Sequence, residues 1–117
     1  MDYKSLEKFL LSFPGASLSF PFDDKTPVLK VAGKMFALLG IEKTPLSINL
    51  KCDPDDAQIL RSQFKTITPG YHMNKEHWNT VLINAGLDED IVKKLISDSY
   101  ALVVKSLSKT KRKELGF

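Results

Sequence analysis

The chain has a single cysteine, Cys52, among its 117 residues. One thiol excludes an internal disulfide and any cysteine-rich zinc site. The sequence also lacks an apolar run near the roughly 20 residues that a membrane-spanning helix needs. Its first residues include acids where a secretion signal is basic. We therefore expect a cytoplasmic protein that has no membrane partner.

The chain has little excess charge outside its C-terminal end. The formal net charge is +3, but residues 105–117 hold five basic side chains and one acid, whereas residues 1–104 hold 12 basic and 13 acidic side chains. The body of the chain is therefore close to neutral. Apolar residues make up 43% of the sequence, which favours one folded domain over residues 1–117. We expect residues 108–117 to be a basic, frayed end of that domain.

Hydrophobic periodicity predicts an α+β fold. The predicted helices are residues 3–13, a segment that starts at 54, and 88 to about 107. The predicted strands are residues 18–22, 28–32, 35–39, 46–50 and 78–83. The order is helix, four-strand meander, helix, strand, helix. This order predicts a two-layer domain in which a single antiparallel sheet packs against helices.

A very short link joins the second and third predicted strands. It consists of Gly33 and Lys34, and so short a link predicts a tight hairpin with Gly33 at positive φ. Lys34 is then expected at the tip of this hairpin, where a lysine can reach a phosphate. Lysines on exposed strands also protect a sheet edge without binding anything.

Residues 69–81 concentrate polar and aromatic side chains. They include both histidines, His72 and His77, and the only tryptophan, Trp78. An aromatic side chain beside amides and a lysine can stack on a base and contact phosphates. The same side chains can instead satisfy the backbone of a long connection, with Trp78 packed against the sheet. The residues alone leave both interpretations open.

The sequence contains few catalytic or metal-binding patterns. His72 and His77 are five residues apart, which fits neither helical nor strand spacing for joint metal ligation. Cys52 comes just before a predicted helix, where the helix terminus can lower a thiol pKa. A catalytic or small-ligand site that joins His72, His77 and Cys52 is therefore one hypothesis. We nevertheless expect no enzyme activity, no cofactor and no metal site.

Five blocks of the sequence, in order, resemble the MmcQ/YjbR family of small bacterial domains, which are labelled DNA-binding proteins. The blocks are Pro14-Gly15-Ala16 with Phe20-Pro21-Phe22, and the runs 28–38, 49–54, 69–81 and 98–104. The resemblance implies a fold similar to that of the bacterial frataxin homologue and of secretion chaperones. It also implies DNA binding by a double wing of hairpins.

Two functions follow as expectations. The first is DNA binding, mainly through backbone phosphates. The second is a protein-interaction or chaperone-like role, in which a sheet face or edge holds a partner peptide. We expect a monomer in either case. The residues expected to contact nucleic acid are Lys34, His72, Asn74, Lys75, Trp78, Lys109, Lys111, Arg112 and Lys113.

Overall fold

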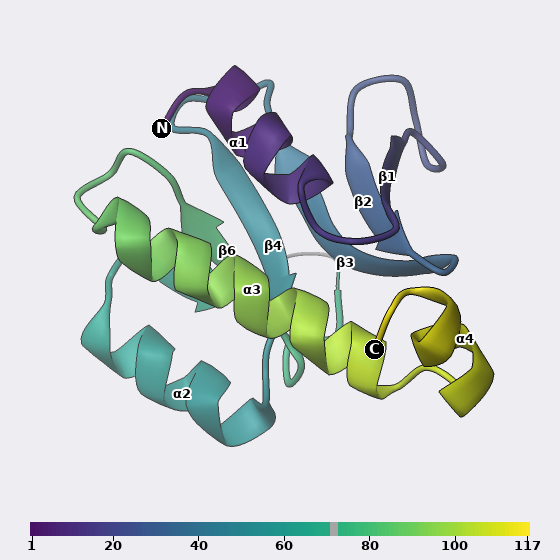
Figure 1. Cartoon of the computed structure of the whole chain (residues 1–117). Coiled ribbons are helices and arrows are strands. Elements are labelled where there is room, and N and C mark those ends of the chain that lie inside the picture. The colour runs from purple at the N-terminus through teal and green to yellow at the C-terminus, as the bar shows by residue number, and fades with distance from the viewer. Residues whose placement is uncertain (71–72) are drawn as a thin grey trace.

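The computed structural model describes residues 1–70 and 73–117, and it confirms the α+β class (Figure 1). Four helices and six strands form within these residues. The helices are α1 (Tyr3–Leu11), α2 (Pro54–Gln63), α3 (Glu89–Lys105) and α4 (Lys109–Glu114). The strands are β1 (Ala16–Ser19), β2 (Val28–Val31), β3 (Lys34–Gly40), β4 (Ser47–Lys51), β5 (Ile67–Pro69) and β6 (Trp78–Leu82).

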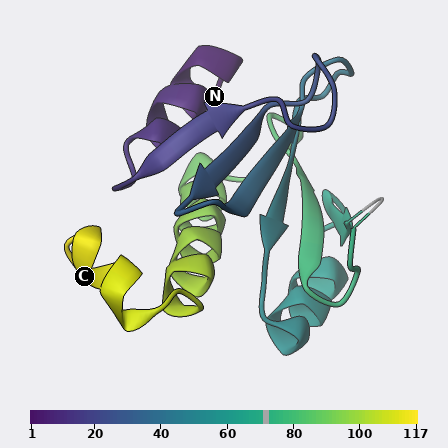
Figure 2. The same ribbon diagram turned by 90° about the vertical axis from the view of Figure 1, so that its right-hand side faces the viewer.

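All neighbouring strands of the sheet are antiparallel, in the order β1-β2-β3-β4-β6-β5. The first four strands form the predicted meander. The chain then leaves the sheet through α2 and returns as the hairpin of β5 and β6. Helices α1 and α3 cover one side of the sheet (Figure 2). No helix in the described part of the chain has both the length and the apolar character to cross a membrane.

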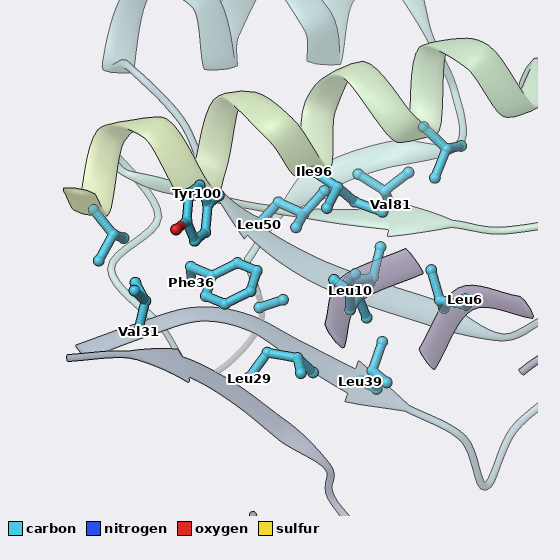
Figure 3. Close-up of a cluster of buried hydrophobic side chains, with 14 of the residues drawn as sticks. Leu6, Leu10, Leu29, Val31, Phe36, Leu39, Leu50, Val81, Ile96 and Tyr100 are labelled. Carbon is cyan, nitrogen blue, oxygen red and sulfur yellow. The ribbon is translucent and has the colours of Figure 1, made fainter. Parts of the chain in front are cut away.

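The hydrophobic core lies between the sheet and helices α1 and α3 (Figure 3). Phe36 of β3 is fully buried, and its ring centroid lies 6.1 Å from that of Phe13 and 5.3 Å from that of Tyr100. Leu6 and Leu10 of α1 are also fully buried, because residues four apart share one face of a helix. The aromatic cluster therefore ties α3 and the end of α1 to the middle of the sheet.

A buried hydroxyl fixes α3 over the centre of the sheet. Ser99 is fully buried, and its Oγ donates to the carbonyl of Phe36 at 2.6 Å and accepts from the backbone nitrogen of Lys51 at 2.9 Å. The small side chain allows close approach, and the hydroxyl satisfies two backbone groups at the edge of the core. This contact holds α3 against β3 and β4 at Ser99.

Two sheet elements differ from the prediction. β1 ends at Ser19, which pairs with Val28, so Phe20 and Phe22 lie beyond the strand. Pro21 explains the early end, because proline cannot donate to a ladder. β5 lies where no strand was predicted, and it pairs with β6. Its three residues are too few for alternation to show.

The C-terminal end is a short helix, whereas residues 108–117 were expected to be frayed. Ser108 caps α4, because its Oγ accepts from the backbone nitrogen of Lys111 at 3.2 Å. After α4 the chain turns back, and Leu115 packs against the core. The ring centroid of Phe117 lies 6.3 Å from that of Tyr100. Leu115 therefore anchors a helix that is otherwise polar, whereas Phe117 stays 58% exposed.

Gly15 makes room for this anchor. Its φ is +73°, and a Cβ at this position would lie 2.4 Å from Cδ2 of Leu115. Only glycine adopts this backbone conformation without strain and allows such close approach. The hydroxyl of Tyr100 donates to the neighbouring carbonyl of Pro14 at 2.5 Å. The C-terminal segment thus packs against the turn that follows α1.

Candidate functional site

The β2–β3 hairpin places Lys34 beside the C-terminal end of α3. The turn residues are Ala32 (φ 50°) and Gly33 (φ 79°), so the predicted turn at Gly33 and Lys34 is one residue too late. Lys34 is instead the first residue of β3. Its Nζ donates to Oγ of Ser106 at 3.2 Å and to the carbonyl of Ser106 at 3.4 Å. A cation suits this position, since the last carbonyls of a helix carry partial negative charge.

This contact brings Lys34 close to the start of α4, which begins three residues after Ser106. Lys105 is the last residue of α3, and α4 begins at Lys109. We name this cluster of cations the basic end. Its members are Lys34, Lys105, Lys109, Lys111, Arg112 and Lys113. All are exposed except Arg112, which is half-buried.

The cations of the basic end have no acidic partner within ion-pair distance among the described residues. The ion pairs found there are Lys25–Glu42 at 3.5 Å, Lys93–Glu89 at 3.4 Å and Lys94–Asp98 at 2.9 Å. Glu114 is the one acid on α4. Cations gathered at one end of a molecule without neutralising acids create a positive potential that attracts anions.

A second group of predicted contact residues lies on the turn before β6. Oδ1 of Asn74 accepts from the backbone nitrogen of Glu76 at 2.9 Å, and its carbonyl accepts from that of Trp78 at 3.0 Å. These bonds shape the turn, so Asn74 has a structural role. Lys75 is exposed. His72 lies outside the described residues.

Arg61 of α2 holds this turn against the body of the protein. Its Nε donates to Oδ1 of Asn79 at 2.6 Å, and its guanidinium donates to the carbonyls of Trp78 at 3.2 Å and of Lys75. A planar guanidinium can hold three acceptors at once. The sequence did not single out Arg61, because an arginine on a helix carries no signal for the distant loop it will contact.

Trp78 begins β6 on the side of the sheet that faces away from α1 and α3. Its partner in register is Lys51. Two residues further along each strand, Oγ1 of Thr80 donates to Oδ1 of Asn49 on the same side. Trp78 is half-buried. Its side chain is therefore neither a core residue nor a fully exposed aromatic surface.

The structure divides the predicted contact residues into two groups. Lys34 joins the cations of α4, whereas Asn74, Lys75 and Trp78 share the turn before β6. In Figure 2, α4 and this turn lie on opposite sides of the molecule. The two groups therefore do not form one continuous surface, and only the basic end concentrates charge.

Comparison with known proteins places the fold in a family. A family model described as YjbR matches residues 11–102, most of the chain. The chain belongs to the YjbR family. Over 98% of both chains, it is 36% identical to a relative from Escherichia coli O157:H7 named "Uncharacterized protein YbdF". Over 98% of both chains it is 32% identical to "Uncharacterized protein YjbR" of Escherichia coli K12.

Solved structures agree with this assignment. DR2400 of Deinococcus radiodurans, described with the domain DUF419, superposes with a TM-score of 0.91 at 38% identity, over 97% of this chain and 87% of that one. A protein from Pseudomonas syringae superposes with a TM-score of 0.75 at 30% identity, over 87% of this chain and 98% of its own. The family resemblance seen in the sequence blocks is thus confirmed. The relatives' names state no ligand.

In this YjbR-family chain the single thiol is not activated. The backbone nitrogen of Cys52 donates to the carbonyl of His77 at 2.7 Å. Burial raises the pKa of Cys52, and the carboxylates of Asp56, Asp53 and Asp98 raise it further. A raised pKa keeps the thiol protonated near neutral pH and therefore a poor nucleophile. No group of three or more metal-ligating side chains occurs within residues 1–70 and 73–117.

Proposed function

We propose that this YjbR-family protein binds DNA, mainly through backbone phosphates, at the basic end. The main support is that six cations from two distant segments gather there without an acidic partner among the described residues. Lysine and arginine side chains neutralise phosphates, and the release of counterions supplies most of the affinity of sequence-independent binding. Serine and threonine side chains at the same end can add hydrogen bonds to phosphate oxygens.

The residue types favour contact with the backbone over contact with base edges. α4 carries lysines but no asparagine or glutamine, the amides that pair with adenine. Arginine is the residue type that most often reads guanine, yet Arg112 is half-buried. α4 is also only six residues long. Binding at this end is therefore expected to show little preference for sequence.

Titration of a short fluorescein-labelled duplex, followed by anisotropy, tests the proposal. With four to six phosphate contacts, affinity is expected to fall by roughly 10²–10³-fold between ~50 and ~200 mM salt. Polyglutamate at the same charge concentration is the matched competitor, because it offers negative charge without a sugar-phosphate backbone. The absence of any anisotropy change with duplex or single-stranded DNA at ~50 mM salt rules out the proposal, and so does equal competition by polyglutamate.

A further inference from the structure

A groove separates α2 from α3 on the helical side of the sheet. It has a volume of about 590 Å³, and Leu50 of β4 and Val81 of β6 contribute to its floor. Leu60 of α2 and Leu95 of α3 line its walls. The two helices run alongside each other in opposite directions (Figure 1), and α2 makes more contact with β5 than with α3. The space between the two helices is thus left unfilled by the fold.

The groove is apolar and open to solvent. Ile59 of α2 lines it and is 53% exposed, although an isoleucine is usually buried. Leu102 of α3 lines the opposite wall and is only half-buried. The volume falls in the range of about 300–1,000 Å³ that is common for binding sites. Uncovered apolar surface that is edged by charged residues is typical of a binding surface.

The charges along the two rims are uneven. The α2 rim carries Asp53 and Asp56, whereas Lys94 and Asp98 on the α3 rim pair with each other at 2.9 Å. Cys52 lies at the same end of the groove, and these carboxylates contribute, after burial, to its raised pKa. Lys51 of β4 also lines this end, so Asp53 and Asp56 leave it with one net negative charge, and both of these acids lie on the α2 side.

We propose that this groove binds an amphipathic helix of a partner protein, whose lysines or arginines face α2. Helices bind such grooves through apolar side chains at positions i, i+3, i+4 and i+7. The apolar floor and walls can accept this stripe, and Asp53 and Asp56 can accept the basic flank. The proposal does not depend on DNA binding, and of the basic end only Lys105 also lines the groove.

A pair of designed helical peptides tests the occupant. One has leucines at i, i+3, i+4 and i+7 and lysines elsewhere, and the other has glutamate in place of each lysine. The Leu/Lys peptide is expected to bind the full chain at least about tenfold more tightly than the Leu/Glu peptide, as charge complementarity requires. Fluorescence anisotropy of labelled peptides measures both affinities. Equal affinities contradict the proposal.

Two matched substitutions test the place of binding. Ile59→Ser is expected to weaken binding of the Leu/Lys peptide about tenfold, because a half-exposed isoleucine becomes buried on binding. Phe22→Ser is the control, since Phe22 is 66% exposed and does not line the groove. The Phe22→Ser variant is expected to bind the Leu/Lys peptide as tightly as the unchanged chain does. Equal losses in both variants, or no loss in either, exclude this groove as the binding site.

Cys52 provides an independent signal, because it is the only thiol and it lines the groove. Saturating Leu/Lys peptide is expected to slow its alkylation by iodoacetamide at about pH 9, where part of the thiol is ionised although burial raises its pKa. An unchanged rate contradicts the proposal. Protection by anilinonaphthalene sulfonate but not by the peptide assigns the groove to a small apolar ligand and overturns it. If the chain sediments as a dimer and Ile59→Ser abolishes the dimer, the groove binds a second copy of the chain, and the proposal is overturned.

Discussion

Replacing Lys109, Lys111 and Lys113 together by glutamine is expected to lower duplex affinity on the order of 10³-fold at ~50 mM salt. Each neutralised phosphate releases counterions, which is worth about tenfold in affinity at this salt concentration. The three lysines are exposed and carry no ion pair among the described residues. Glutamine has nearly the same helix propensity as lysine, so α4 is expected to persist. Arg112 stays unchanged because it is half-buried.

A second triple variant controls for total charge. Lys4, Lys43 and Lys65 are also exposed, and they lie on α1, in the loop after β3 and after α2. Their replacement by glutamine removes the same charge from surfaces away from α4. Affinity is expected to change by less than about tenfold, because charges well beyond the Debye length, which is ~10 Å at ~0.1 M and somewhat longer at ~50 mM salt, are largely screened. Equal losses in the two triple variants would mean that net charge, not the basic end, drives binding.

Phe36→Ala is expected to lower the free energy of unfolding by about 3–5 kcal/mol. The ring is fully buried between Phe13 and Tyr100, so its removal leaves a cavity as well as losing apolar burial. A loss of this size is a large part of the 5–15 kcal/mol that is usual for a domain. Urea denaturation measures the change through the midpoint at constant m-value.

Phe22→Ala is the matched control for this stability measurement. Phe22 is 66% exposed on the loop between β1 and β2, so the same chemical change there leaves no cavity. Its effect is expected to stay within about 0.5 kcal/mol. A loss of unfolding free energy below ~1 kcal/mol in Phe36→Ala would contradict the packing of Phe36 in the core, since Phe→Ala in a packed core costs several times more.

The elements that the sequence predicted well have strong local signals. Asp53 before Pro54 marked the start of α2, and the structure shows Oδ1 of Asp53 accepting from the backbone nitrogens of Asp55 and Asp56. The alternation of Leu46, Ile48 and Leu50 marked β4. These signals act within a few residues, so a single sequence can display them.

The features that were missed depend on contacts between distant residues. α4 persists because Leu115 reaches a space that Gly15 leaves open, and nothing within residues 108–117 shows this. Lys34 was expected at a hairpin tip, but its partner Ser106 is 72 residues away. The groove between α2 and α3 exists because α2 packs on β5 and α3 packs on β3 and β4, with little contact between the two helices. Helical spacing predicts an apolar face but does not show what covers it.

The sequence predicted which residue types form the candidate site better than it predicted how those residues are grouped in space. The basic character of the C-terminal end was clear from the sequence, and the structure adds Lys34 to it. The turn at Asn74 was described with two open roles, and its hydrogen bonds to Glu76 and Trp78 favour the structural one. Whether any of these residues contacts DNA stays a prediction.

Amide chemical-shift mapping during titration with a short duplex at ~50 mM salt tests the binding site most directly. It reports on both groups of predicted residues in one experiment. We predict that the largest shifts fall on Lys34, on Lys105 and across α4 (Lys109–Glu114), while Asn74, Lys75 and Trp78 shift little. Shifts confined to the turn before β6, with α4 unchanged, would contradict the assignment of DNA binding to the basic end.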